Sequence, residues 1–191
     1  MSEELTGKSA DLKAWMLLHR TRDLAFYCED RVFSEYGLTA EQYTTLAAIK
    51  YFDDPVRPTD IGGWVGHKVN TVSMIVDRMV NAGLIERMRD LPDRREVRVT
   101  ITKKGEETFA PATPAAWDLV QDVMSSLSDE EKRTLIRLLE KVRDKAVEHL
   151  SPEGEIRESK SYETADLSRL MKRLGKCVST STPKRTLRRT A

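Results

Sequence analysis

The first hydrophobic pattern in the chain predicts one long helix over residues 9–36. Apolar residues recur there at spacings of three, four and seven, and His19 and Arg22 interrupt the stripe. Its apolar members are Leu12, Trp15, Phe26, Phe33 and Tyr36. A helix of this length usually buries its stripe against a second long helix or a partner chain, and we expect the same here.

Polar residues separate this helix from the next one. Gly37 ends the first pattern, and Thr39, followed by Gln42 three residues later, has the spacing of a capping box. The helix that opens there is expected to run to Phe52, because the sequence Asp53-Asp54-Pro55 then breaks it.

Two further helical patterns cover residues 58–65 and 69–82. Gly62 and Gly63 weaken the shorter helix, each at about 1 kcal/mol relative to alanine. Gly83 is suited to end the longer helix, because glycine readily adopts the left-handed conformation found after helix C-termini. The expected buried face of the longer helix consists of Val72, Ile75, Val76, Met79 and Val80.

Two strand-like runs follow, over residues 84–89 and 96–102, with turn-forming residues at 90–94 between them. The second run alternates Val97, Val99 and Ile101 with Arg98 and Thr100. Three helices followed by a hairpin is the order of a winged helix-turn-helix. The predicted fold class is therefore mainly α with a small β-hairpin wing, flanked by long helices.

The rest of the chain predicts two long helices and a polar tail. Thr102 opens a helix to about Leu127, with Pro111 and Pro114 expected to kink it or delay its start. A second capping box at 128–131 opens a helix with Leu135, Leu138, Leu139, Val142 and Ala146 on one face. Residues 151–191 are polar; one short helix is expected near 163–174, and most of 176–191 is expected to be disordered.

Charge is distributed unevenly along the chain, although the formal net charge is only +1. Residues 57–105 hold ten Lys and Arg against six Asp and Glu, and residues 167–191 hold eight Lys and Arg and no acidic residue. These two basic concentrations predict a polyanionic partner. A basic tail alone is weaker evidence, since such tails often only increase solubility.

Composition excludes several classes of protein. Mean hydropathy is −0.51, and no apolar run approaches the ~20 residues needed to span a bilayer. No secretory leader is expected, and two widely separated cysteines, Cys28 and Cys177, imply no disulfide framework, so a cytoplasmic location is expected. The three histidines are isolated and no catalytic constellation is found. We therefore expect no enzyme, no metal and no cofactor.

The N-terminal part of the 69–82 helix carries short polar side chains suited to the DNA major groove. We expect Asn70, Thr71, Ser73 and Met74 to read or flank bases, since Asn can pair with adenine through two hydrogen bonds. Lys68 and Arg78 are better placed for phosphates. Taken alone, the segment would more often be an ordinary amphipathic helix with a solvated polar face. The hairpin tip, Asp93-Arg94-Arg95, favours the DNA interpretation, because an arginine on a slender wing can enter the minor groove.

Residues 38–105 resemble the winged-helix core of the MarR family of bacterial and archaeal transcription regulators. The matching segments are Leu38-Thr39 with Gln42-Tyr43, Thr71-Val72-Ser73 with Val76-Asp77-Arg78-Met79, Gly83-Leu84-Ile85-Glu86-Arg87, and Asp93-Arg94-Arg95 with Val99-Thr100-Ile101-Thr102-Lys103-Lys104-Gly105. The helices at 9–36 and 103–150 also resemble the family's dimerisation region. The tail after residue 151 is longer than the family usually carries.

The resemblance implies a homodimeric repressor that binds a pseudo-palindromic operator on double-stranded DNA and is released by a small molecule or an oxidant. It divides the chain into a dimerisation helix at 1–37, a DNA-binding core at 38–105, dimerisation helices at 106–150 and a tail at 151–191. The rival hypothesis is a structural winged helix that binds DNA non-specifically or mediates protein contacts, with the basic tail as its main adhesive.

By the same resemblance, Trp15, His19, Arg22 and Trp64 are candidates for binding an aromatic or anionic effector. The alternative is that the tryptophans belong to the core and that His19 and Arg22 form intersubunit hydrogen bonds. Some relatives sense peroxides through a cysteine on the first helix, but Cys28 lies too close to the Leu38-Thr39 opening. We therefore expect Cys28 to be a buried structural residue.

Overall fold

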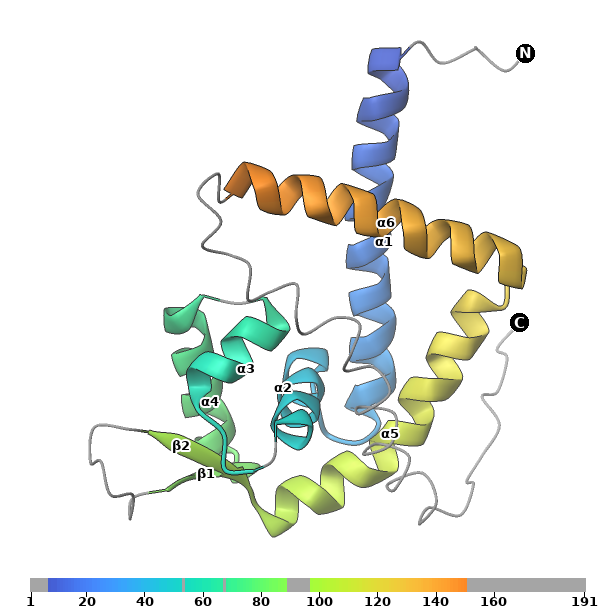
Figure 1. The fold of residues 1–191 in the computed structure, drawn as a ribbon. Helices are drawn as coiled ribbons and strands as arrows, with labels where there is room; N and C mark the ends of the chain where they lie inside the picture. The colour runs from blue at the N-terminus through green and yellow to red at the C-terminus, as the bar shows by residue number, and fades with distance from the viewer. Residues whose placement is uncertain (1–6, 53, 67, 89–96, 151–191) are drawn as a thin grey trace.

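The structure is a computed structural model that describes residues 7–52, 54–66, 68–88 and 97–150. The expected hairpin turn and the tail, including the expected helix near 163–174, lie outside these ranges. Within them the chain forms α1 (Gly7–Ser34), α2 (Ala40–Tyr51), α3 (Pro58–Val65), α4 (Val69–Asn81), β1 (Ile85–Met88), β2 (Arg98–Ile101), α5 (Lys103–Met124) and α6 (Asp129–Leu150). Figure 1 shows α2, α3, α4 and the hairpin gathered beside the C-terminal end of the long α1 helix.

The predicted capping box at the start of α2 is confirmed. Thr39 Oγ1 accepts the Gln42 N–H at 3.2 Å, and Gln42 Oε1 accepts the Thr39 N–H at 2.9 Å. Asp30 on α1 adds a third bond, because its carboxylate accepts the Ala40 N–H at 2.6 Å. The two helices are therefore joined through the otherwise unsatisfied donors of the α2 N-terminus.

The next two helices, α3 and α4, also begin and end close to their predicted positions. Pro58 stands in the first turn of α3, where its missing N–H costs nothing, and Gly66 ends that helix with a left-handed φ of 71°. Gly83 follows α4 with a φ of 71°. As predicted, Val72, Ile75, Val76 and Met79 are buried, and Val80 is half-buried.

The sheet is shorter than predicted and has a third participant. β1 and β2 are antiparallel, with Arg87 opposite Val99. Val56, just before α3, forms an isolated bridge to Val99 through two backbone hydrogen bonds of 2.9 Å. The strand alternation is confirmed only in part: Val99 is buried and Ile101 half-buried, whereas Val97 is exposed.

The hydrophobic core lies where the end of α1 meets α2, α3, α4, the hairpin and the start of α5. At its centre Phe33, Tyr43 and Phe109 form a stack, with ring centroids 4.0 Å and 5.0 Å apart. The other large buried side chains of this core are Leu38, Leu46, Ile49, Val56, Ile61, Val72, Ile75, Val76, Met79, Leu84, Ile85 and Val99. This core fixes the winged helix-turn-helix onto the long helices.

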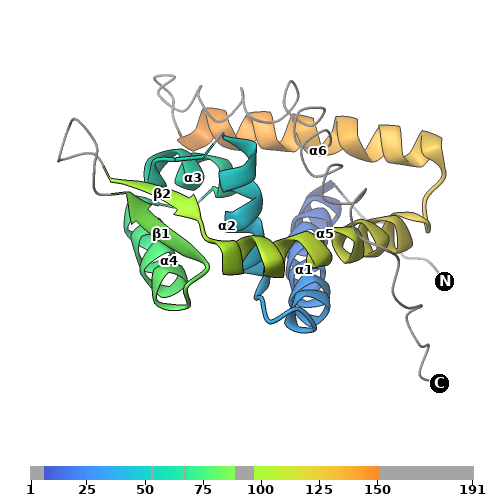
Figure 2. The same cartoon turned by 90° about the horizontal axis from the view of Figure 1, so that it is seen from below.

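The last two helices differ in how they pack. α5 begins directly at Lys103 and includes both Pro111 and Pro114, so the prolines do not delay it. Figure 1 shows the helix bent near its middle, in agreement with the predicted kink. α6 contains no buried residue, and Figure 2 shows it along one edge, apart from α1. Its predicted apolar face therefore remains exposed in the single chain, with Leu138, Leu139 and Val142 among its members.

The prediction that Cys28 is buried was wrong. Cys28 is exposed, because it lies on a part of α1 that nothing described in the same chain covers. The helix also exposes several large apolar residues, namely Leu12, Trp15, Met16, Leu17, Leu18, Leu24, Phe26 and Tyr27. Among the described residues, no helix combines the length and the hydropathy needed to cross a bilayer.

Candidate nucleic-acid interface

The outward face of α4 carries the residues predicted to read DNA. Asn70, Thr71, Ser73 and Met74 are all exposed, and Met74 has 63% of its surface accessible. At 100° per residue, Asn70 and Met74 lie almost opposite the buried face formed by Val72, Ile75, Val76 and Met79. Because the core holds that opposite face, the two side chains point directly away from the protein.

The two predicted phosphate contacts differ in their surroundings. Lys68 precedes α4, is exposed, and makes no side-chain capping hydrogen bond. Arg78 is exposed but already engaged: its guanidinium donates to Glu41 on α2 at 3.3 Å and to the Met74 carbonyl at 3.3 Å. Arg78 is therefore exposed on α4 with its charge paired by Glu41.

A second ion pair joins α4 to the hairpin. Arg87 on β1 donates to the carboxylate of Asp77 on α4. Asp77 belongs to the same outward face as Asn70 and Met74, since seven residues of helix turn through almost two complete turns. Asp77 and Arg87 belong to the segments that resemble the MarR family, but the sequence predicted no role for either residue.

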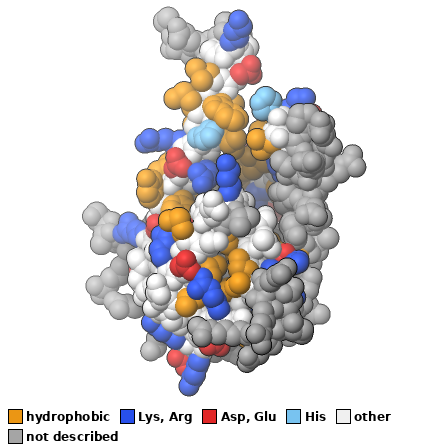
Figure 3. Space-filling model, turned by 90° about the vertical axis from the view of Figure 1, so that its left-hand side faces the viewer, with side chains coloured by type: hydrophobic (Ala, Val, Ile, Leu, Met, Phe, Trp, Pro, Cys, Tyr) orange, Lys and Arg blue, Asp and Glu red, His pale blue; other side chains and the backbone are white. Residues whose placement is uncertain are grey.

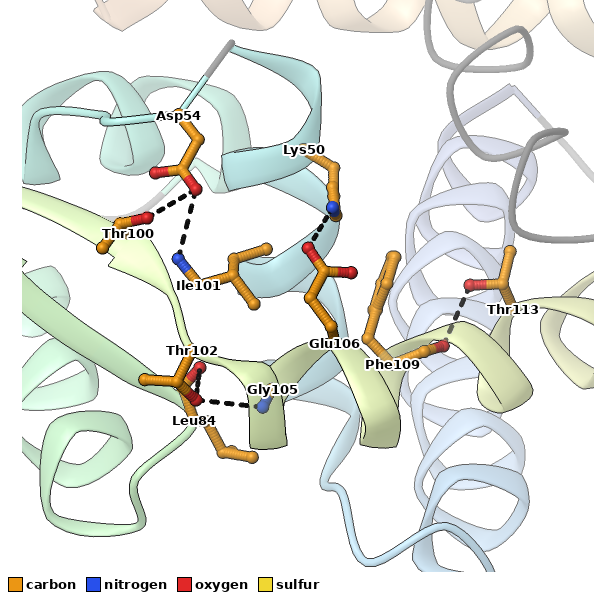
Figure 4. A network of polar contacts seen from close by, with 10 residues as sticks. All are labelled: Lys50, Asp54, Leu84, Thr100, Ile101, Thr102, Gly105, Glu106, Phe109 and Thr113. Atoms are coloured by element: carbon orange, nitrogen blue, oxygen red, sulfur yellow. Dashed lines mark hydrogen bonds and ion pairs between the residues drawn. The ribbon is translucent and has the colours of Figure 1, made fainter.

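The hairpin is held firmly at its base, as Figure 4 shows. The Thr102 hydroxyl donates to the Gly83 carbonyl at 2.6 Å and accepts the Gly105 N–H at 3.0 Å, while the Thr102 N–H donates to the Leu84 carbonyl at 3.1 Å. Lys104 Nζ donates to the Ala82 carbonyl at 2.7 Å. The end of α4, the end of β2 and the start of α5 therefore form one junction.

Two further contacts tie this region to the preceding helices. The Thr100 hydroxyl donates to Asp54 at 2.6 Å, and Lys50 forms an ion pair with Glu106 (Figure 4). Asp54 precedes the Val56 bridge, so the connection between α2 and α3 is fastened to β2. The candidate interface thus consists of α4 and a hairpin that are attached to the same junction.

The tip of the hairpin, with Asp93, Arg94 and Arg95, lies outside the described residues. Figure 3 views the side of the molecule that carries α3, α4 and the hairpin. Lys and Arg side chains are spread over the whole of this face, and many of the hydrophobic side chains lie along its upper part, where α1 runs.

The candidate effector residues do not form one cluster within the chain. Trp15 and His19 make an edge-to-face contact on α1, with ring centroids 4.7 Å apart, and Arg22 pairs with its neighbour Asp23 at 3.5 Å. Trp64 on α3 is half-buried, and its ring stacks with that of Tyr51 on α2, with the ring centroids 6.0 Å apart.

Comparisons with known proteins agree on one family. A model of the MarR family matches residues 36–96. The chain is 36% identical over 126 residues to the HTH-type transcriptional regulator MgrA of Staphylococcus aureus, an alignment that covers 66% of this chain and 84% of MgrA.

Solved structures show the same fold. The organohalide-sensing regulator RdhR-CbdbA1625, in its 2,4-dichlorophenol-bound form, has a TM-score of 0.69 at 22% identity and covers 78% of this chain and 88% of its own. A mutant of MarR from E. coli in complex with operator DNA has a TM-score of 0.65 at 23% identity, covering 72% of this chain and 98% of its own.

Proposed function

The chain belongs to the MarR family of DNA-binding transcriptional regulators, and on that premise we propose that it is a homodimeric repressor released from a pseudo-palindromic operator by a small effector. In this proposal residues 38–105 bind DNA, residues 1–37 and 106–150 form the dimer, and 151–191 is an accessory tail. The protein acts in the cytoplasm, where the chromosome of a bacterium or archaeon is accessible.

The observation that carries this proposal is the outward face of α4. Asn70 and Met74 are exposed at its centre, and the buried side of the same helix fixes their direction. Thr71 and Ser73 flank these two residues, and Lys68 and Arg78 contact phosphates. The wing residues Asp93, Arg94 and Arg95 act at the adjacent minor groove. One helix offers few base contacts, so sequence selectivity requires a second copy.

The exposed apolar faces support a homodimer. α1 exposes Trp15 to 56% and Leu12 to 60%, and α6 exposes Leu138 and Val142 to 47% each. An apolar surface of this extent on two long helices is unusual for a monomer and marks an interaction site. Its occupant in this proposal is the same surface of a second copy, as twofold symmetry allows.

An effector of aromatic or anionic character fits the residues on α1. Trp15 and His19 offer an aromatic surface, and Arg22 on the same helix offers a positive charge. We propose that the second copy completes this site, with Trp64 on α3 as a further member. The similar fold of the dichlorophenol-bound regulator supports a small aromatic ligand.

Selection of 30-bp duplexes from a random library by the full-length protein tests this function. A repressor yields a consensus sequence and prefers it over a scrambled duplex by at least about 10³-fold. Deleting residues 176–191 leaves that ratio almost unchanged. The rival structural protein yields no consensus and loses most of its affinity when the tail is removed.

A further inference from the structure

Asp77 is an unexpected residue for a surface that faces DNA. It lies on the outward face of α4, in line with Asn70 and Met74, and its side chain is 58% exposed. An unpaired carboxylate at this position would repel the phosphates on both sides of the groove. Some compensating interaction is therefore needed for α4 to enter the groove.

Arg87 supplies this interaction from a different element. It lies on β1, opposite Val99 in the register of the hairpin, and its guanidinium donates to Asp77. The pair neutralises the carboxylate at the interface. It also commits the guanidinium to Asp77, although the exposed position of Arg87 would suit a phosphate contact.

The pair joins the two DNA-contacting elements above their common base. Below it, the hairpin is attached through Thr102, whose hydroxyl and N–H bind the Gly83 and Leu84 carbonyls. The β2 side of the hairpin is held further along by the backbone hydrogen bonds between Val99 and Val56 and by the bond from Thr100 to Asp54. The contact from Arg87 to Asp77 ties the β1 side directly to α4, opposes movement of the hairpin relative to that helix and sets the direction of the wing.

We propose that Asp77 and Arg87 are a positioning pair that holds the wing at the angle required for operator recognition. The inference rests on the proposed function, because it assigns these residues to sequence selectivity rather than to overall affinity. Neither residue needs to contact a base. Their effect acts through Asn70, Met74 and the wing tip, which must reach adjacent grooves at the same time.

The test is a double-mutant cycle with Asp77→Asn, Arg87→Met and the combined variant. Affinities are measured by fluorescence anisotropy across a salt titration, for the duplex selected by the wild-type protein and for its scrambled sequence. The variants Lys145→Met and Glu148→Gln, which break an exposed ion pair of α6 (2.9 Å), reproduce the same charge changes away from the hairpin. Circular dichroism confirms that each variant is folded.

A positioning pair predicts that each single variant lowers the ratio of specific to scrambled affinity by roughly tenfold, comparable to losing one base contact. The combined variant is then no worse than Arg87→Met alone, and Asp77→Asn does not weaken binding to the scrambled duplex. The α6 controls keep the wild-type ratio.

The proposal is overturned if Arg87→Met weakens both duplexes equally, reduces the salt slope by about 1 and adds independently to Asp77→Asn, since Arg87 is then a phosphate contact. It is also overturned if all variants keep the wild-type ratio, while the proposed function stands. A wild-type protein that selects no consensus overturns the proposed function itself, and the positioning role with it.

Discussion

The guanidinium of Arg78 on α4 lies 3.3 Å from a carboxylate oxygen of Glu41 on α2 and donates a hydrogen bond to it. The same group donates to the Met74 carbonyl. Glu41 therefore holds Arg78 beside the side of α4 that is proposed to face DNA, and it partly neutralises the charge of Arg78. α4 thus takes part in two ion pairs. It supplies the cation, Arg78, to the pair with α2 and the anion, Asp77, to the pair with β1.

Replacing the members of this pair should change DNA affinity in opposite directions. Arg78→Ala removes a phosphate contact, so we expect binding to all duplexes to weaken by about threefold or more and the salt slope to fall by about 1. Glu41→Gln removes the competing carboxylate and should strengthen binding to all duplexes. Salt titrations by fluorescence anisotropy measure both, with Lys145→Met as a charge-matched control. Unchanged affinity for Arg78→Ala would exclude a phosphate contact.

Gly105 should tolerate no side chain. A Cβ atom there would lie 2.1 Å from the Leu84 carbonyl oxygen and 2.7 Å from Ile101 Cγ2, and the backbone atom cannot move aside cheaply. We expect Gly105→Ala to reduce the free energy of unfolding by about 1–3 kcal/mol. Urea denaturation measures the loss. Gly7→Ala, at a helical glycine with open space around it, is the control and should lie within about 0.5 kcal/mol of wild type.

The exposed stripe of α6 should be required for the dimer. Leu139 is 42% exposed in the single chain, and a charge placed there would have to be buried on association. We expect Leu139→Glu to shift sedimentation from dimer to monomer at micromolar concentration. Arg137→Glu introduces the same side chain on the opposite side of the helix and should leave the dimer intact. A dimeric Leu139→Glu variant would show that the stripe is not the interface.

The free energy of unfolding at acidic pH should depend on the second capping box, formed by Ser128 and Glu131. The N–H and the hydroxyl of Ser128 both donate hydrogen bonds to the Glu131 carboxylate. These bonds lower the pKa of Glu131 below its ordinary value, and the backbone N–H has the larger effect. Because the folded pKa is the lower one, the carboxylate stabilises the folded chain at neutral pH. This contribution is lost as the pH falls through the folded pKa.

Ser128→Ala should therefore raise the titration midpoint of Glu131 toward its ordinary value, since only the backbone donor remains. Carboxyl-carbon chemical shifts followed by NMR from pH 7 downwards give the midpoint in both proteins. Identical midpoints would show that the serine hydroxyl does not contribute to the low pKa of Glu131.

The parts of the fold that the sequence predicts well are those with local causes. Thr39 with Gln42 opens α2 as expected, because a capping box is satisfied within four residues. Pro58 and Gly66 delimit α3 for equally local reasons, and the two glycines within that helix do not prevent it. The 3.6-residue period of α4 correctly separates its buried face from Asn70 and Met74.

The parts that were missed or wrong depend on contacts between distant segments. The bridge between Val56 and Val99 involves a single residue before α3. A single residue shows no alternation of apolar and polar positions, so the sequence gives no sign of this pairing. The pairing of Asp77 with Arg87 depends on how the hairpin folds back toward α4. Cys28 was expected to be buried because cysteines usually are, but within the described chain nothing covers its part of α1.

Hydroxyl-radical footprinting on the selected duplex tests whether α4 and the wing read DNA as part of a symmetric dimer. We expect two protected half-sites related by twofold symmetry, with centres about one helical turn (~10–10.5 bp) or a multiple of it apart. Protection at the centre of each half-site should weaken in the Asn70→Ala variant. A single asymmetric footprint, or uniform protection along the duplex, would show that the protein does not bind as a symmetric dimer that reads DNA through α4.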